Sequence, residues 1–291
     1  MIKRTQRLFG KIFHGFAGVL GMMAVLWMAT PLLSAAQEPG SIVERDSRVQ
    51  GHTYLFEETG EEVPYALFVP SNYDASRPFP LIVALHGLGR PCDWMMGYDR
   101  FIDFAERDGY VVVSPLGYHP RAWYGSRGYG IPGGAARGGA DLPENLGELS
   151  EQDVMNVLEI ARKSYNIDES RIYLWGHSMG GAGTYHLAAR YPDISAGLAV
   201  AAPAPRRETI DQLETFREVP VLVLHGDEDA TVPVEGSRSW VARMRELGMQ
   251  HVYIEVPGGD HSLFVREAPE TLAKVFAFFN IVGKDERSVR R

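Results

Sequence analysis

The stretch Arg171-Ile-Tyr-Leu-Trp-Gly-His-Ser-Met-Gly-Gly181 decides how the rest of the chain is interpreted. Its apolar, β-prone half, from Ile172 to Trp175, is followed by the motif Gly-x-Ser-x-Gly, and residues 182–190 have the composition of a helix. A strand, a sharp turn and a helix form the context in which this motif carries a nucleophilic serine. The turn strains the backbone at Ser178 and holds its hydroxyl clear of the chain, at a helix N-terminus that favours negative charge. The alternative is a glycine-rich turn with an incidental serine.

The first 36 residues have the features of an export signal. Four basic residues precede an apolar run from 16 to 28, and Ser34-Ala-Ala36 forms a small-residue cleavage site before Gln37. This pattern predicts a signal peptide at residues 1–36. An uncleaved anchor is the alternative, because the apolar run from 16 to 33 nearly reaches the ~18–20 residues of a membrane span. We expect cleavage and export, to a periplasm or out of the cell, without stable membrane association afterwards.

The remaining residues, 37–291, are expected to form a single α/β domain, since 45% of the 291 residues are hydrophobic and one large core can be buried. Residues 1–36 hold four basic and no acidic residues, so their removal changes the formal net charge from −8 to −12. An acidic chain without a basic tract is a poor partner for nucleic acid or anionic lipid. The single cysteine, Cys92, excludes an internal disulfide.

No metal and no cofactor are expected. The histidines are scattered, one cysteine cannot make a thiolate site, and no His-x-x-x-His pair has a carboxylate beside it. The glycine-rich stretch 176–181 lacks the lysine of a phosphate-binding loop.

The order of apolar and polar segments predicts an α/β fold. Two β-rich runs at 53–56 and 65–69 indicate an antiparallel hairpin, and later, mostly apolar runs indicate strands buried on both faces of a parallel sheet. These strands are expected at 81–85, 110–114, 172–175, 198–202, 219–224 and 252–256. Helices are expected at 101–107, 154–161 (after a capping box at 150–153), 182–190, 207–217, 237–247 and 269–279. The alternation predicts a doubly wound, mostly parallel sheet with an antiparallel start.

A serine hydroxyl is a weak nucleophile, so Ser178 needs a base within hydrogen-bonding distance and an acid that orients the base. Ligands of open parallel sheets lie at the carboxyl ends of the strands, so these partners should follow later strands. The strand at 219–224 continues into His225-Gly-Asp-Glu-Asp229, and the strand at 252–256 continues into Pro257-Gly-Gly-Asp-His261. The order serine, acid, histidine is that of the α/β-hydrolase arrangement.

Three sequence blocks resemble the α/β-hydrolase serine esterases of the carboxylesterase, feruloyl esterase and polyhydroxybutyrate-depolymerase-like group. They are Gly-His-Ser-Met-Gly-Gly at 176–181, His-Gly-Asp-Glu-Asp-x-x-Val-Pro at 225–233 and Asp-His-Ser at 260–262, and the resemblance extends from Tyr65 to Phe279. It implies that Ser178 is the nucleophile, Asp229 the orienting acid and His261 the general base.

Neighbouring acids and histidines are alternatives for these roles. Asp227 and Glu228 lie within two residues of Asp229; Asp227 is expected to brace the loop, and Asp260 to be a turn residue. The other histidines of these segments are expected to be structural or to support the site: His177, His186 and His225.

The oxyanion of an acyl-transfer reaction needs N–H donors. One is expected from Met179, the residue after the nucleophile, and a second from the loop that follows the strand at 81–85. In His86-Gly-Leu-Gly89 the family pattern points to the N–H of Leu88, and a glycine on each side allows the backbone to turn this donor inward. An ordinary tight turn is the alternative.

Residues 117–149 interrupt the alternation with nine glycines and several aromatic residues. Long loops of this kind are functional or disordered. Since the segment follows a strand whose carboxyl end faces the site, Trp123 and Tyr124 are candidate substrate contacts, and an aromatic acyl group such as feruloyl would suit such a wall. The alternative is a surface loop whose aromatic residues pack for stability.

The leading hypothesis is an exported serine hydrolase that cleaves carboxylic esters through an acyl-enzyme. The same three residues can cleave peptides, as in prolyl-oligopeptidase-like relatives, or transfer acyl groups to an alcohol. A catalytically inactive binding protein on this fold is the alternative from another class, and the presence of Ser178, Asp229 and His261 argues against it.

Overall fold

The computed structural model of the chain describes residues 42–127 and 142–283. The predicted signal peptide at 1–36 and the middle of the predicted insertion lie outside these ranges. The signal peptide and its boundary with residues 37–291 therefore stay predictions.

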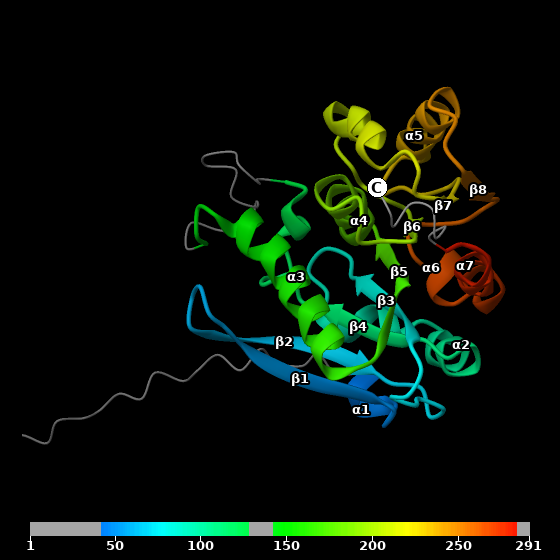
Figure 1. Cartoon of the computed structure of the whole chain (residues 1–291). Helices are drawn as coiled ribbons and strands as arrows, with labels where there is room; N and C mark the ends of the chain where they lie inside the picture. The colour runs from blue at the N-terminus through cyan, green and yellow to red at the C-terminus, as the bar shows by residue number, and fades with distance from the viewer. Residues whose placement is uncertain (1–41, 128–141, 284–291) are drawn as a thin grey trace, which may run out of the picture. The chain divides into compact units, whose positions relative to one another are not determined.

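Eight strands form one sheet in the order β1-β2-β4-β3-β5-β6-β7-β8 (Figure 1). The strands are β1 (Val49–Phe56), β2 (Glu61–Phe68), β3 (Phe79–Leu85), β4 (Val111–Pro115), β5 (Ile167–His177), β6 (Gly197–Ala201), β7 (Val221–Gly226) and β8 (His251–Val256). The β1–β2 and β2–β4 pairs are antiparallel and the other five are parallel. The predicted mostly parallel sheet with an antiparallel start is confirmed.

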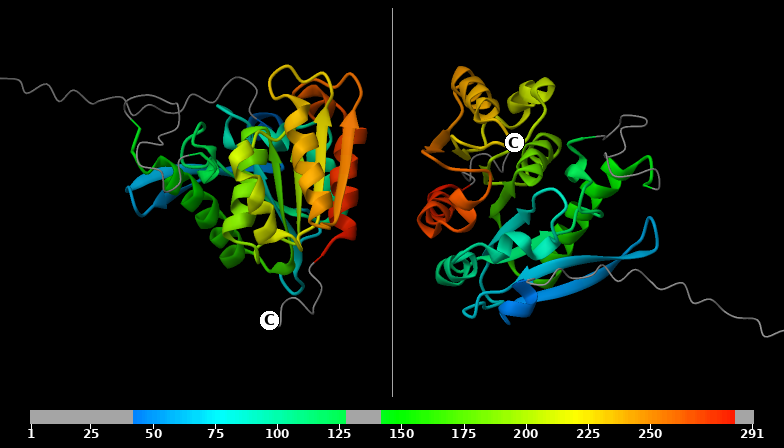
Figure 2. Two further views of the ribbon diagram at one scale, coloured as in Figure 1. Left: turned by 90° about the horizontal axis from the view of Figure 1, so that it is seen from above. Right: turned by 180° about the vertical axis from the view of Figure 1, so that it is seen from behind.

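Helices cover both faces of this sheet (Figures 1 and 2). They are α1 (Ile42–Arg45), η1 (Cys92–Gly97), α2 (Phe101–Asp108), η2 (Trp123–Gly125), α3 (Leu146–Ser164), α4 (Met179–Arg190), η3 (Arg207–Phe216), α5 (Val234–Glu246), α6 (Leu263–Arg266) and α7 (Pro269–Ile281), where η denotes a 3₁₀-helix. Alternate residues of β3 point to opposite faces, so Leu81 and Val83 pack with α3, α4, η3 and α5, whereas Ile82 and Ala84 pack with η1, α2, α6 and α7. Two apolar layers thus bury the sheet on both sides, as predicted.

Helix α3 begins at Leu146, and the predicted capping box at 150–153 is wrong. Ser150 and Asp153 are fully buried inside the helix. Ser150 Oγ accepts the N–H of Tyr124 at 3.0 Å, and Asp153 accepts the N–H groups of Gly117 and Tyr118 at 2.6 and 2.8 Å. These polar residues attach the loop after β4 to α3 and do not begin a helix.

The carboxyl ends of the parallel strands meet at one edge, and two glycines allow close backbone contact there. A Cβ atom on Gly180, in the first turn of α4, would lie 1.8 Å from the carbonyl oxygen of Leu85 at the end of β3. A Cβ atom on Gly226, the last residue of β7, would lie 2.2 Å from the carbonyl oxygen of Gly259. The loops after β3, β5, β7 and β8 are therefore held together at this edge.

Gly180→Ala should lower the free energy of unfolding by about 3 kcal/mol, because the new methyl group meets backbone that cannot move away. Gly236→Ala is the matched control: Gly236 is an exposed residue of α5, and no described atom lies within 4 Å of its added Cβ. That change should stabilise the protein by about 0.5 kcal/mol. Urea denaturation measures both values, and similar effects of the two substitutions would contradict the close approach.

Candidate active site

Ser178 lies between the end of β5 and the start of α4, in a backbone conformation that is rare for a residue with a side chain. Its φ is 56° and its ψ is −112°. Two hydrogen bonds hold this turn: the N–H of Ser178 donates to the carbonyl of Ala201 at 2.9 Å, and its carbonyl accepts the N–H of Ala204 at 3.1 Å. A strained residue persists where its surroundings fix it, as they do here. The geometry is that of the turn expected from the Gly-x-Ser-x-Gly motif.

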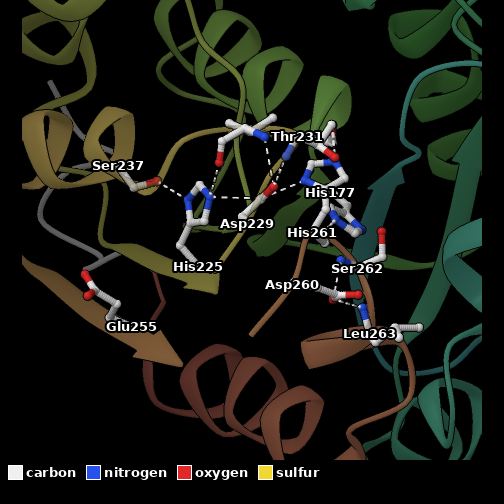
Figure 3. A network of polar contacts seen from close by, with 12 residues as sticks. His177, His225, Asp229, Thr231, Ser237, Glu255, Asp260, His261, Ser262 and Leu263 are labelled. Carbon is white, nitrogen blue, oxygen red and sulfur yellow. Dashed lines mark hydrogen bonds and ion pairs between the residues drawn. The ribbon is translucent and has the colours of Figure 1, made fainter. Parts of the chain in front are cut away.

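The structure brings Ser178, His261 and Asp229 together as a hydrogen-bonded series. His261 Nε2 lies 3.0 Å from Ser178 Oγ, and His261 Nδ1 lies 2.7 Å from Asp229 Oδ2. Asp229 follows β7 and His261 follows β8, so both come from the carboxyl edge of the sheet, as does Ser178. Figure 3 shows the Asp229 side chain with His261 on one side and His225 on the other.

The Asp229 carboxylate is buried but receives four hydrogen bonds. Oδ1 accepts the N–H groups of Thr231 and Val232, each at 2.8 Å, and Oδ2 accepts from His261 and from His225 Nε2, the latter at 3.1 Å. Burial raises the pKa of Asp229, but the hydrogen bonds from Val232, His261 and Thr231 outweigh burial and lower it below its ordinary value. The Asp229 carboxyl group is therefore ionised in the folded protein at neutral pH.

The neighbouring acids occupy other positions. Asp227 Oδ1 accepts the N–H of Gly258 at 2.6 Å and so connects the loops after β7 and β8. Asp260 Oδ1 accepts the N–H groups of Ser262 and Leu263 at 2.9 and 2.7 Å, which fixes the turn before α6. Both contacts agree with the bracing and turn roles expected from the sequence.

Two buried histidines support the series without contacting Ser178 Oγ. His225 Nδ1 lies 2.7 Å from Ser237 Oγ, while its Nε2 faces Asp229; burial lowers the pKa of His225. His177 Nε2 lies 2.8 Å from the carbonyl oxygen of His261, and burial, followed by the nearby charge of His261, lowers the pKa of His177 to about 3. His186 lies on α4 and pairs with Glu151 at 2.6 Å.

The two N–H groups expected as oxyanion donors lie in the loop after β3 and at the first residue of α4. Within the described part of the chain, the N–H groups of Leu88 and Met179 donate no hydrogen bond, so both are available to a ligand. The loop is fixed on either side of Leu88: the N–H of Gly89 donates to the carbonyl of Pro120 at 2.7 Å, and His86 Nε2 lies 2.9 Å from the carbonyl of Leu116. Their role as an oxyanion hole is a proposal.

Tyr124 is fully buried and does not have the substrate contact predicted for it. Its hydroxyl accepts the N–H of His86 at 3.0 Å, and a Cβ atom on Gly183 of α4 would lie 2.7 Å from the Tyr124 side chain. The residue therefore packs between α4 and the loop after β3. Trp123 is partly exposed, with the Arg127 guanidinium 3.5 Å from its ring centroid, and stays a candidate contact.

The sequence did not point to two aromatic residues beside the site. Trp94 lies in η1 and stacks on His177 with ring centroids 5.3 Å apart, and Tyr98, which ends η1, hydrogen-bonds His177 Nδ1. Trp94 lies in a 3₁₀-helix and Tyr98 directly follows it, and such a short helix leaves no hydrophobic periodicity to detect.

Residues 57–253 match the profile of a protein family whose description reads "Putative esterase", and the chain belongs to this esterase family. This match confirms the resemblance found in the sequence blocks and covers the strand–turn–helix that holds Ser178 as well as Asp229.

Individual relatives are similar over parts of their length. A bifunctional acetylxylan esterase/xylanase of Neocallimastix patriciarum is 27% identical over 180 residues, which cover 62% of this chain and 23% of that protein. Acylamino-acid-releasing enzyme 1 of Oryza sativa is 25% identical over 247 residues, covering 70% of this chain and 30% of that one. The chain thus spans less than a third of either relative. The solved ferulic acid esterase of Anaeromyces mucronatus, in complex with ferulic acid, shares the fold: its TM-score is 0.60 at 18% identity, over 80% of this chain and 90% of that chain.

Two further features concern residues 42–127 and 142–283 alone. Among these residues there is no cluster of three or more side chains that could hold a metal ion. None of their helices has the length and apolar composition to cross a membrane.

Stability should decrease on acidification because of His177. The unfolded chain takes up a proton at this residue below about pH 6.5, whereas the pKa of about 3 keeps it neutral in the folded chain. As the pH falls from about 6.5 to about 5, protonation of this residue in the unfolded chain should therefore lower the free energy of unfolding by about 2 kcal/mol. Urea denaturation at both values should show a correspondingly smaller decrease for His177→Gln, which does not titrate. Equal pH dependence of the two proteins would contradict a buried, neutral His177.

Proposed function

We propose that the protein hydrolyses carboxylic esters through an acyl-enzyme, with Ser178 as nucleophile, His261 as general base and Asp229 as the orienting acid. The observation that carries this proposal is the hydrogen-bonded series from Ser178 Oγ through both nitrogens of His261 to Asp229 Oδ2, with separations of 3.0 and 2.7 Å. This chemistry requires a base within hydrogen-bonding distance of the nucleophile and an orienting group within hydrogen-bonding distance of the base.

In the first half of the reaction, Ser178 Oγ attacks the carbonyl carbon of the ester and its proton passes to His261 Nε2. The carbonyl oxygen becomes an oxyanion that the N–H groups of Leu88 and Met179 would stabilise, with the N-terminus of α4 behind Met179. His261 then gives its proton to the alcohol oxygen as the C–O bond breaks, and the alcohol leaves. In the second half, water attacks the carbonyl carbon of the acyl-enzyme and passes a proton to His261. His261 returns this proton to Ser178 Oγ as the bond to the acyl group breaks, which releases the carboxylic acid and free Ser178.

Asp229 has two tasks in these steps. Its carboxylate accepts the Nδ1–H of His261, so that Nε2 presents a lone pair to Ser178. It also carries a negative charge beside the imidazolium that forms. The lowered pKa of Asp229 keeps that charge in place, and the contacts with His225, Thr231 and Val232 keep the carboxylate from turning away.

For the substrate we propose an ester between a small or aromatic acid and a carbohydrate hydroxyl. The support lies in the similarity to an acetylxylan esterase and, in fold, to an esterase that binds ferulic acid. Apolar side chains near the proposed machinery agree with an uncharged acyl group: Leu88 and Leu263 are 47% and 45% exposed, and each lies within two residues of His86 or His261. The proposed signal peptide agrees with a polymeric substrate, which such an enzyme meets only after export.

A fluorophosphonate probe should label the wild-type protein and leave Ser178→Ala unlabelled, because only an activated serine reacts with it. Labelling is measured by fluorescence of the denatured protein in a gel. The purified enzyme should then hydrolyse p-nitrophenyl acetate and methyl ferulate.

An unlabelled wild-type protein would overturn the assignment of a nucleophile. The similarity to an acylamino-acid-releasing enzyme makes amide hydrolysis the competing activity. Faster turnover of a dipeptide amide than of these esters would replace the proposed reaction by that one.

Asp229→Asn should lower kcat by about 1,000-fold or more, because an amide at this position favours the wrong tautomer of His261. Asp227→Asn is the matched control two residues away: its carboxylate faces the Gly258 N–H, so kcat should stay within about threefold of wild type. Steady-state kinetics with one p-nitrophenyl ester compares the two. Similar losses in both variants would show that the orienting acid is misassigned.

A further inference from the structure

His177, the residue before the nucleophile, is attached to the backbone of the proposed base. Its Nε2 lies 2.8 Å from the carbonyl oxygen of His261. A carbonyl oxygen only accepts hydrogen bonds, so Nε2 carries the proton. Nδ1 must then be the acceptor, and the hydroxyl of Tyr98 donates to it. The two contacts together fix a single tautomer of His177 and direct its N–H at His261.

The surroundings of His177 hold the ring in this orientation. His177 is fully buried and Tyr98 is 2% exposed. Trp94 stacks on the His177 ring at 5.3 Å with an angle of 26° between the planes, and the Tyr98 ring meets Trp94 edge-on at 5.1 Å. After Tyr98, the N–H of Asp99 donates to the carbonyl of Arg266 at 2.8 Å, which joins the end of η1 to the last residue of α6. The segment from His261 to Arg266 is therefore attached at its start to His177 at the end of β5 and at its end to Asp99, the residue after Tyr98.

His261 is therefore held in position relative to Ser178 by two separate contacts. Its imidazole contacts Ser178 Oγ at 3.0 Å, and its carbonyl contacts the covalent neighbour of Ser178. The loop before it includes Gly258, with φ of 67°, and Gly259, so few side chains restrain the backbone there. Asp227 and Asp260 hold the residues on either side of His261, and the contact from His177 is the one that holds the carbonyl of His261 itself.

We infer that His177 and Tyr98 form a base-positioning pair, in which Tyr98 fixes the tautomer of His177 and His177 holds the backbone of His261 at the distance that proton transfer from Ser178 needs. The inference rests on the proposed function of Ser178 and His261. Neither residue of the pair touches the reacting atoms. Their contribution is positional, and a displacement of about 1 Å at a reacting group lowers a rate by about 100-fold.

Three variants test the pair by steady-state kinetics with a p-nitrophenyl ester, each with its melting temperature. His177→Leu keeps the bulk and removes the N–H, and kcat should decrease by about 10- to 100-fold while KM stays within about twofold. His177→Gln restores an N–H at nearly the same place, and kcat should return to within about fivefold of wild type. Tyr98→Phe frees Nδ1 to take the proton, and kcat should decrease by about tenfold.

Tyr110→Phe is the matched control for Tyr98→Phe. It removes a hydroxyl that donates to Asn280 Oδ1 at 2.9 Å, away from the loops of the site. Its melting temperature should decrease as much as that of Tyr98→Phe, with kcat unchanged. This comparison separates a positional effect from a general loss of stability.

Wild-type kcat in a folded His177→Leu, absence of recovery in His177→Gln, or an equal loss of kcat in Tyr110→Phe and Tyr98→Phe would each overturn the inference. Failure of the proposed function has a different signature. In that case the fluorophosphonate probe leaves the wild-type protein itself unlabelled, and the inference is overturned together with it.

Discussion

The architecture of the site depends on close backbone contact at the carboxyl edge of the sheet. Gly180 lets the first turn of α4 approach the end of β3, and Gly226 lets the end of β7 approach the loop after β8. Any side chain at either position would push one loop away from the other. Because of these two contacts, the loop after β3, Ser178, Asp229 and His261 lie within hydrogen-bonding distance of one another or on adjoining turns, although they follow four different strands.

The electrostatics of this edge distinguish His261, the proposed base, from its three histidine neighbours. Burial lowers the pKa of His86, His177 and His225 and so favours the neutral form of these three rings. His177 and His225 each face one carbonyl oxygen and one hydroxyl, which fixes the direction of their hydrogen bonds. His261 alone among the four bridges the serine and the ionised Asp229. The neutral rings supply directed polar contacts without adding positive charge that would oppose protonation of His261.

Sequence reasoning predicted correctly which residues lie together where their positions follow from the ends of parallel strands. The strands after Ser178 are apolar runs that are easily recognised, and the residues that follow them converge because the strands are parallel. Sequence reasoning failed where the same residue pattern is compatible with two different structures. Ser150 and Asp153 have the spacing of a helix cap, yet they bind the loop after β4. Tyr124 has the composition of a pocket residue, yet it is fully buried. Long-range contacts such as those of Tyr98 leave no local signal.

The lone cysteine has a consequence for the chemical durability of the fold. Cys92 is the first residue of η1, the segment that carries Trp94 and Tyr98. Although the residue is partly exposed, burial raises the pKa of its thiol to about 12. Oxidation and disulfide exchange proceed through the thiolate, which is scarcely populated here. The raised pKa therefore disfavours the reactive form of the one thiol in this packing, and with a single cysteine the fold forms without an internal disulfide.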